Sequence, residues 1–352
     1  MNAGGYDAIL VVSFGGPEAP EHVVPFLENV TRGRGIPRER LEQVGAHYQL
    51  FGGKSPINDH CRSLIAALRI ELDDAGIDLP IYWGNRNWHP MLEDTMQHMA
   101  DDGVTRALAF VTSATSSYSA CRQYREDIER ARAAVGASAP EVHKIRQYYD
   151  HPGFIEPMID NARTALATLE PDARLVFTAH SIPLSMSSSS DYVAQLTEAS
   201  RLVAHGVGHD DFDLVWQSRS GPPQIPWLEP DINDHLDALH TAGFTNVVVT
   251  PIGFISDHME VMYDLDTEAQ ATADRLGMGF ARASTVGSNH RFVSAIRELI
   301  EERCSGGPAF AVGDLAVRPD FCAPDCCPAP VRPTPVRPGK QPSIPDTGEA
   351  ET

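Results

Sequence analysis

A row of carboxylates is the feature of this sequence with the clearest capacity for chemistry. A helix that begins near Ser256, a good N-cap residue, is expected over SDHMEVMYDLDTE, residues 256–268. Three acidic side chains spaced four residues apart would then line one face, with Asp257 one turn earlier: Glu260, Asp264 and Glu268. Such a row can pass protons or hold a divalent cation. The alternative is a solvated acidic face, because like charges at this spacing cost only about 0.3 kcal/mol per pair.

His180 is a second candidate, because it follows Leu175-Val176-Phe177, a run that is typical of a buried strand. In a parallel sheet, the residue that ends a strand borders the edge where ligands bind. An imidazole at this edge can exchange protons near neutral pH. A single histidine is more often a hydrogen-bonded structural residue, so the sequence leaves both interpretations open.

Half of the six cysteines lie in FCAPDCCPAP, residues 321–330, as Cys322, Cys326 and Cys327. The chain has no visible signal peptide, so its expected location is the cytoplasm, where disulfide bonds are rare. Clustered cysteines in such a chain favour a metal site.

Composition excludes several classes of partner. The chain has 352 residues and a formal net charge of -20, which would repel a nucleic-acid backbone or an anionic membrane surface. No run approaches the roughly 18 apolar residues that a transmembrane helix needs. We therefore expect a globular protein without a transmembrane segment that does not bind nucleic acid.

Each half of the chain alternates short β-branched runs with longer segments of helical periodicity. The runs at residues 8–12, 107–111, 175–177 and 247–249 predict strands buried on both faces, and weaker strands are expected at 81–83, 143–148, 214–217 and 278–281. Helical stripes such as residues 63–72 and 293–300 separate them. The pattern predicts an α/β fold of two doubly wound, Rossmann-like domains with four-stranded parallel sheets.

We expect the two domains at residues 1–149 and 150–316. A cysteine-rich segment at 317–327 and a proline-rich tail at 328–352 follow, and the tail is expected to be disordered because it cannot bury a core. After the first strand, Ser13-Phe14-Gly15-Gly16-Pro17 forms a tight turn that lets the backbone approach a ligand. The GxGxxG and GxxxxGK[ST] fingerprints of nucleotide sites are missing.

Several motifs in a fixed order resemble the ferrochelatases, which insert ferrous iron into a porphyrin. They are FGGKSPI (51–57), GNRNWHP (84–90), FTAHSIP (177–183), QSRSGPPQIPWL (217–228) and PIGFISDHMEVMYDLD (251–266). The resemblance runs from about residue 7 to about residue 300 and is strongest to the actinobacterial members, which are similar to enzymes that metallate coproporphyrin III. It implies a lyase of haem biosynthesis that takes Fe2+ and coproporphyrin III as substrates and forms Fe-coproporphyrin III in a porphyrin cleft between the domains.

The resemblance implies that His180 and Glu260 form an iron-binding pair on one face of the macrocycle and that Asp264 continues a proton path outward. Two pyrrole N–H protons must leave as hydrated Fe2+ loses its waters, so the pair must supply a base and a metal ligand. Either residue fits either role. By the same resemblance, Phe14 is expected on the opposite face of the macrocycle, where porphyrin chelatases of some other bacteria have a tyrosine. Because phenylalanine has no hydroxyl, no phenolate ligand to the iron is expected there.

The resemblance further implies porphyrin contacts by Arg32, Ser55, Tyr124 and Trp227. The four propionates of coproporphyrin need cations or hydrogen-bond donors, and TRGR (31–34) and GGKS (52–55) look suited to supply them. Arg34 and Lys54 are equally compatible with ordinary surface charge. Trp227 is equally compatible with a core position.

Some ferrochelatases hold a [2Fe-2S] cluster by three carboxy-terminal cysteines and one from the first half. By this resemblance the ligands here are Cys121, in SSYSAC (116–121), with Cys322, Cys326 and Cys327. Four thiolates also suit zinc, although two adjacent cysteines make a zinc-finger spacing less natural. The spacing departs from that of animal members, and four unligated thiols are the remaining alternative. Cys61 and Cys304 are expected to take no part.

Two other functions fit the same residues. One is a related chelatase that loads cobalt or nickel, or that acts on protoporphyrin IX, and the other is a non-enzymatic haem carrier. A carrier has no need for a carboxylate row beside His180, which makes it the weaker alternative. The expected partners are coproporphyrin III and ferrous iron, with transient contact with haem-pathway enzymes.

Overall fold

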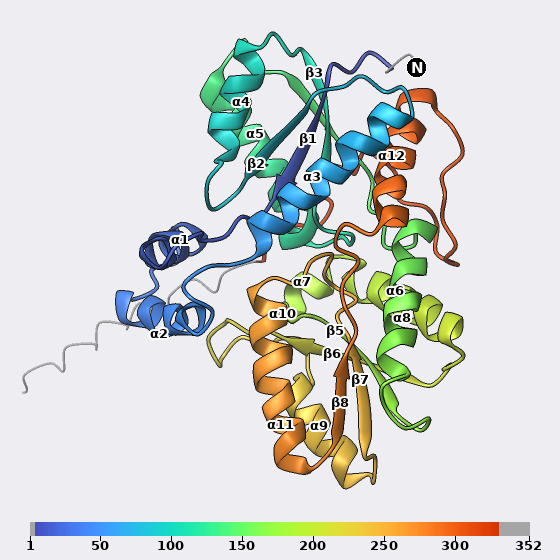
Figure 1. The fold of residues 1–352 in the computed structure, drawn as a ribbon. Coiled ribbons are helices and arrows are strands. Elements are labelled where there is room, and N and C mark those ends of the chain that lie inside the picture. The colour runs from blue at the N-terminus through green and yellow to red at the C-terminus, as the bar shows by residue number, and fades with distance from the viewer. Residues whose placement is uncertain (1–3, 331–352) are drawn as a thin grey trace, which may run out of the picture.

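Two parallel sheets of four strands form the framework of the chain, seen in a computed structural model that describes residues 4–330 (Figure 1). The first sheet has the order β2 (Ile81–Asn85), β1 (Ala8–Ser13), β3 (Arg106–Val111) and β4 (Glu141–Lys144). The second has the order β6 (Phe212–Gln217), β5 (Arg174–His180), β7 (Asn246–Thr250) and β8 (Gly279–Arg282). The predicted fold class, two doubly wound α/β units with four parallel strands each, is confirmed.

Helices cover both faces of each sheet (Figure 1). Those of the first half are α1 (Val23–Val30), α2 (Arg38–Gln49), α3 (Ile57–Asp74), α4 (Leu92–Asp101) and α5 (Gln123–Val135), with the short turns η1 (Pro20–His22) and η2 (Tyr118–Arg122). Those of the second half are α6 (Pro152–Leu166), α7 (Leu184–Ser187), α8 (Tyr192–Val207), α9 (Ile232–Thr241), α10 (Met259–Tyr263), η3 (Asp264–Ala269), α11 (Gln270–Leu276) and α12 (His290–Ser305).

The central strands form where the sequence is apolar and β-branched. All six residues of β1 are buried, because β1 lies between β2 and β3 with helices on both faces. In register, Val11 pairs with Trp83 on one side and with Phe110 on the other. Short apolar runs of this kind can bury both faces only in the middle of a parallel sheet, which is why they predicted the strands well.

One strand differs from its expected place. The sequence predicted a strand at 143–148, but β4 ends at Lys144. The next side chain that leaves the sheet is Arg146, which is buried and donates to both carboxylate oxygens of Glu302, at 2.8 and 3.0 Å, and to the carbonyl of Phe310 at 2.9 Å. These partners lie outside the sheet, so the chain turns away from β3 to satisfy them.

The two halves share one hydrophobic core. Helix α12 comes late in the chain but packs against both α6 and α3, beside which it lies in Figure 1. The predicted boundary at 149/150 falls in the buried connection between β4 and α6, and the division into domains at those bounds stays a prediction. Most of the predicted tail, residues 331–352, lies outside the described residues.

The segment after α12, residues 306–330, runs back over both halves, and we call it the carboxy-terminal strap. The amide of Val312 donates to the carbonyl of Asp150 at 2.9 Å, and Arg318 forms an ion pair with Asp191 at 2.5 Å. Further along, the guanidinium of Arg122 donates to the carbonyl of Cys326 at 3.1 Å. The strap therefore returns the three late cysteines to the first half. Within residues 4–330, no helix is long and apolar enough to cross a membrane.

Candidate functional site

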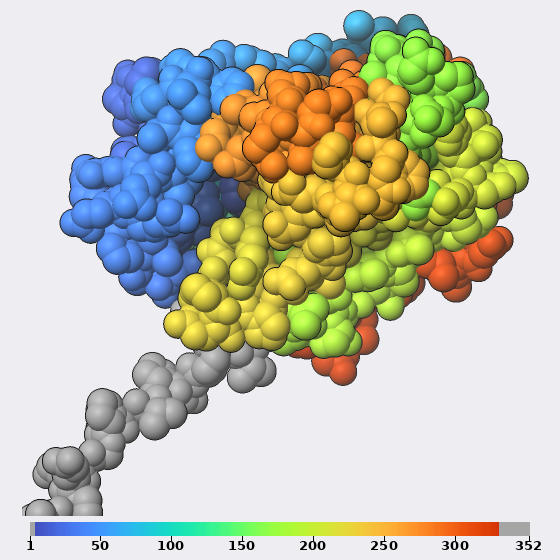
Figure 2. All heavy atoms as spheres, turned by 90° about the horizontal axis from the view of Figure 1, so that it is seen from below, coloured from blue at the N-terminus to red at the C-terminus, as the bar shows by residue number. Residues whose placement is uncertain are grey.

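The site lies in a hollow between the halves. Figure 2 shows this hollow bordered by the segment that carries α1 and α2, in blue, by the loop after β6, in yellow, and by α10 and its continuation, in orange. The carboxyl ends of parallel strands are the edge where ligands bind, and β5 and β7 contribute the residues that follow those ends. The predicted pair, His180 and Glu260, comes from these two neighbouring strands.

His180 is the last residue of β5 and is held from two directions. Its ring nitrogen Nδ1 lies 2.5 Å from the carbonyl oxygen of Ser181, and the hydroxyl of Tyr192 on α8 donates to the carbonyl of His180 at 2.9 Å. A carbonyl can only accept, so Nδ1 carries a proton and Nε2 is the ring nitrogen left to act in the site. Nε2 points to the carboxylate of Glu260, with Oε1 at 3.6 Å. The structure therefore brings together the two residues predicted as a pair.

Glu260 lies in the first turn of α10, which begins later than the sequence suggested. The N-cap is His258, whose Nδ1 accepts a hydrogen bond from the amide of Glu260 at 3.2 Å, so the expected cap at Ser256 is wrong. Burial lowers the pKa of His258 and keeps its ring in the neutral, accepting form. Almost half of the Glu260 side chain is exposed to the hollow.

Asp264 continues the row at the start of η3, a π-helical turn between α10 and α11. Its Oδ2 accepts a hydrogen bond from the hydroxyl of Ser218 and one from Nε2 of Gln217 at 3.4 Å. Burial raises the pKa of Asp264 to about 7, with a smaller contribution from the charge of Glu260. Ser218 has a φ of 62°, a left-handed conformation that a residue with a side chain seldom adopts, so the loop after β6 is bent to reach this carboxylate.

Asp257 does not belong to the row. Its Oδ1 accepts from Nη1 of Arg282 on β8 at 2.9 Å, and Arg282 also forms an ion pair with Asp266. Arg282 thus pairs with both Asp257 and Asp266, and these two ion pairs tie the start of α10 and the turn η3 to β8. Glu260 and Asp264 form no ion pair with an Arg or Lys side chain of residues 4–330.

Tyr48 on α2 is a neighbour that sequence reasoning missed. Burial and the charges of Glu260 and Asp264 hold the pKa of its phenol above the ordinary value, so its hydroxyl stays neutral and can donate a hydrogen bond. The preceding residue, His47, stacks on Tyr263 of α10 with ring centroids 4.0 Å apart and planes 11° apart. Through the stacking of His47 on Tyr263, α2 contacts the second half across the hollow. The only signal in the sequence is that HYQL precedes the FGGKSPI motif.

The predicted residues of the opposite wall come from the first half. Phe14 follows β1 directly and packs edge-on against Phe26 of α1, with ring centroids 6.2 Å apart. Tyr124 on α5 is buried, and that burial raises the pKa of its phenol. The guanidinium of Arg86 lies over both rings, 4.4 Å from the centroid of Tyr124 and 5.8 Å from that of Phe14.

The other predicted contacts have different surroundings. Ser55 is buried, and its amide donates to the carbonyl of Pro17 at 2.8 Å, so it lies beside the turn after β1. Arg32 is exposed and donates to Oδ1 of Asn29 at 2.6 Å. Lys54 forms an ion pair with Asp59 at 2.6 Å, which uses the charge of its ammonium. Trp227 lies flat against the backbone of Gly221, where a Cβ atom would come within 2.4 Å of the indole.

The four predicted cysteine ligands line one hollow of about 220 Å³ on another side of the first half. Cys121, in η2, interacts with Cys322, and the sulfur atoms of Cys326 and Cys327 are 3.4 Å apart. The hydrogen bond with Cys121 lowers the pKa of Cys322 to about 7. Cys327 has a φ of 50°, a strained left-handed conformation that turns it toward Cys326.

As the side chains stand, no group of three or more His, Cys, Asp or Glu in residues 4–330 is arranged to hold a metal ion. Four thiols from two segments nevertheless share one hollow. Cys61 on α3 and Cys304 on α12 lie away from that hollow.

Comparisons with known proteins agree with this geometry. The family model described as Ferrochelatase matches residues 6–304. A coproporphyrin III ferrochelatase of Nocardia farcinica is 58% identical over 312 residues, covering 85% of this chain and 89% of that protein. Proteins of the same name from Mycolicibacterium smegmatis and Streptomyces coelicolor are 55% and 52% identical, each over 86% of this chain and over 91% and 87% of their own lengths.

Among solved structures, SirB from Bacillus subtilis with Fe3+ superimposes with a TM-score of 0.53 at 12% sequence identity, covering 84% of this chain and 96% of that one. At that identity the likeness shows a shared fold alone.

Proposed function

This chain belongs to the ferrochelatase family, and we propose that it inserts Fe2+ into coproporphyrin III to give Fe-coproporphyrin III in haem biosynthesis. Three relatives that carry the name coproporphyrin III ferrochelatase, at 52–58% identity, support this substrate. The observation that carries the proposal is the pair of His180 and Glu260, whose Nε2 and Oε1 atoms lie 3.6 Å apart and open to the hollow.

In the reaction, the porphyrin core exchanges two N–H protons for one ferrous ion. When the ring is neutral, the lone pair of Nε2 of His180 can either accept a proton or bind iron, and the carboxylate of Glu260 beside it can take the other role. Because Nδ1 is committed to the carbonyl of Ser181, the ring cannot turn Nε2 away from the macrocycle without breaking that hydrogen bond. The pair can therefore receive the iron and the first proton at one place.

Asp264 suits the next step, the removal of protons. With a pKa of about 7, it can accept a proton near neutral pH and release it again, which an ordinary carboxylate near 4 does poorly. The charges of the same two carboxylates help to keep the phenol of Tyr48 neutral by raising its pKa. Glu268, one turn further out, is exposed and leads to solvent.

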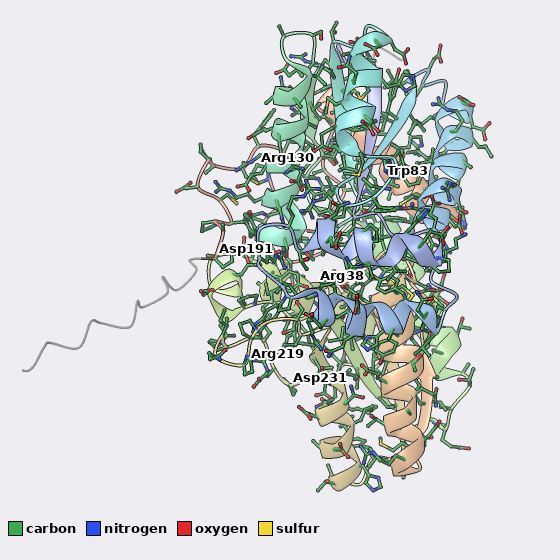
Figure 3. All side chains as sticks on the ribbon, turned by 90° about the vertical axis from the view of Figure 1, so that its left-hand side faces the viewer. Arg38, Trp83, Arg130, Asp191, Arg219 and Asp231 are labelled. Atoms are coloured by element: carbon green, nitrogen blue, oxygen red, sulfur yellow. The ribbon has the colours of Figure 1, made fainter. Side chains whose placement is uncertain are left out.

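The propionates of the substrate need positive charge at the lips of the hollow. Of the predicted donors, Lys54 is paired with Asp59, whereas Arg32 forms no ion pair within residues 4–330. On the lip formed by the loop after β6, Arg219 is exposed and donates to the carbonyl of Ile225 at 3.3 Å. Figure 3 labels Arg219 on the loop after β6 and Arg38 on α2. We assign propionate docking to Arg32 and Ser55, with Arg219 as an addition from the structure.

The flat faces of the macrocycle need apolar contacts. Phe14 supplies aromatic surface on the side opposite His180, with the buried ring of Tyr124 behind it beneath Arg86, and a phenylalanine at position 14 offers no axial oxygen to the iron. Trp227 fills this role less directly, because its indole is used against Gly221 and its Nε1 is buried without a hydrogen-bond partner. We propose that Trp227 forms an apolar wall of the cleft within the loop that carries Arg219.

For the second hollow we propose a [2Fe-2S] cluster held by Cys121, Cys322, Cys326 and Cys327. The support is that all four thiols line the same space. A cluster there would supply iron-sulfur redox chemistry and a covalent link between η2 and the carboxy-terminal strap. The cytoplasmic location and the transient contact with haem-pathway enzymes stay predictions.

The deciding experiment is anaerobic metallation with Fe2+, comparing coproporphyrin III with protoporphyrin IX at equal concentration. We expect a clear preference for coproporphyrin III in kcat/KM. Faster turnover with Co2+ or Ni2+ than with Fe2+ would favour a related chelatase. Tight binding of the iron porphyrin without turnover of the free porphyrin would favour the haem carrier.

A further inference from the structure

The motif GNRNWHP, residues 84–90, has no part in the chemistry described so far, although it touches the predicted wall of the hollow. It continues from the end of β2 and pairs with the turn after β1. The amide of Arg86 donates to the carbonyl of Ser13 at 3.0 Å, and the amide of Asn87 donates to the carbonyl of Phe14 at 3.1 Å. The side-chain amide of Asn87 donates to the same carbonyl at 3.1 Å. The motif thus fixes the backbone that carries Phe14.

The side chain of Arg86 is buried between elements that are far apart in the sequence. It forms an ion pair with Asp127 on α5, and only 5% and 9% of the two side chains are exposed. Asp127 is also paired with Arg130, which Figure 3 labels on α5 at the surface. The guanidinium plane lies near the rings of Tyr124 and Phe14. One buried cation therefore connects the wall residue after β1 with the wall residue on α5.

A buried ion pair is a poor way to gain stability. Removing two charges from water costs about as much as their attraction returns, and apolar residues of the same volume often do better. The pair instead fixes the orientation of the side chains. A planar guanidinium held by a carboxylate can stack on a neighbouring ring in only one position. Neither Phe14 nor Tyr124 can turn far while Arg86 stays between them.

We propose that Arg86, held by Asp127 and stacked on the buried ring of Tyr124, is a positioning residue that fixes the ring of Phe14 as the wall of the porphyrin cleft opposite His180. The inference rests on the proposed function, in which Phe14 contacts the macrocycle. A wall ring at the wrong angle leaves a gap, so the porphyrin binds less tightly and tilts away from the pair of His180 and Glu260. Arg86 itself touches neither the iron nor the pyrrole nitrogens in this role.

The test is a set of variants measured by quenching of coproporphyrin III fluorescence and by metallation. Arg86→Met should raise the Kd of the porphyrin about tenfold, as expected for loss of a desolvated cation–π contact. Phe14→Leu should do the same, and the double variant should be no worse than either single one, because both changes remove one wall. Effects that multiply in the double variant, or an unchanged Kd for Arg86→Met, would overturn the proposal.

Arg86→Lys separates position from charge. Lysine keeps the charge but loses the plane, so it should recover only a minor part of the lost affinity. Full recovery would mean that charge alone matters and would contradict a positioning role.

Arg106→Met is a matched control. Arg106 lies 5.5 Å from the ring centroid of Tyr6 and is paired with Glu141 at 3.0 Å, the same two kinds of contact far from the hollow. The control should bind porphyrin as the unaltered protein does.

Removal of Arg86 alone leaves Asp127 buried with only Arg130, which can reduce folding yield. The variant with Arg86→Met and Asp127→Leu removes both charges and should fold, with the same tenfold rise in Kd. A normal Kd in this folded variant would sink the idea. If the unaltered protein neither binds nor metallates coproporphyrin III, the proposed function has failed; if it does both and Arg86→Met is unaffected, only this inference has failed.

Discussion

Replacement of Asp264 by Asn should stabilise the protein most above pH 7, less at pH 5 and very little below pH 4. Burial raises the pKa of Asp264 from an ordinary 3.8 to about 7, so the folded protein holds a proton that the unfolded chain has already released. The difference, at about 1.4 kcal/mol per pKa unit, gives an upper limit of about 4 kcal/mol. The carboxyl is partly open to solvent, so we expect about 2 kcal/mol.

The sign follows from proton binding. Between pH 4 and pH 7 the folded state binds the extra proton, so the contribution of this group to the free energy of unfolding falls as the pH rises. Above pH 7 both states are ionised and the full cost of the buried charge remains. Asparagine carries no charge at any pH, and its carbonyl oxygen can still accept the hydrogen bond from Ser218. The stability gained by the variant should therefore grow from pH 4 to pH 7 and then stay constant.

The assay is urea unfolding followed by tryptophan fluorescence from pH 5 to pH 8.5, with Asp274→Asn as the control. Asp274 is an exposed acidic residue on α11, so its replacement changes the net charge equally without removing a buried carboxylate. We expect the control to differ from the unaltered protein by less than about 0.5 kcal/mol at every pH. A gain for Asp264→Asn that is the same at pH 5 and pH 8.5, or a loss at pH 8.5, would refute the assignment of a raised pKa to this carboxyl.

Three further outcomes are expected. His180→Ala should abolish metallation but leave the Kd of coproporphyrin III within about threefold, since the residue acts at the reacting centre and most binding area lies elsewhere; near-normal turnover would contradict its role. Glu260→Gln should lower kcat strongly, by about a hundredfold, and Asp264→Asn more mildly, by about tenfold, in anaerobic assays; equal and unimpaired rates would favour a solvated acidic face. The purified protein should be coloured, with iron and acid-labile sulfide near two each per chain, and Cys121→Ser should bleach and destabilise it by about 3 kcal/mol or more, because the cluster closes a loop of roughly 200 residues. A colourless zinc protein, or colour that survives Cys121→Ser, would show the wrong metal or the wrong fourth ligand.

The local sequence was enough for the sheets. The buried strands β1, β3, β5 and β7 are short apolar runs that only the middle of a parallel sheet can bury, and the expected positions agree with the structure within a few residues. The residues after those strands were found for the same reason, because ligands bind at the carboxyl edge. The pairing of His180 with Glu260, 80 positions apart, was implied instead by the resemblance to the ferrochelatases.

Contacts between distant segments decided the rest. The helix of the carboxylate row begins at Met259 because Asp257 is taken by Arg282 and His258 becomes the cap, and neither partner is marked by local spacing. The chain leaves β4 early because Arg146 finds Glu302 about 150 residues later.

The raised pKa of Asp264, the neutral phenol of Tyr48 and the pair of Arg86 with Asp127 also exist only in the assembled hollow. The sequence by itself determined which side chains could perform the chemistry, because residue type and hydrophobic period are local properties. Only the tertiary structure decided their charge states and their orientation, because burial and pairing depend on groups that meet after the chain has folded.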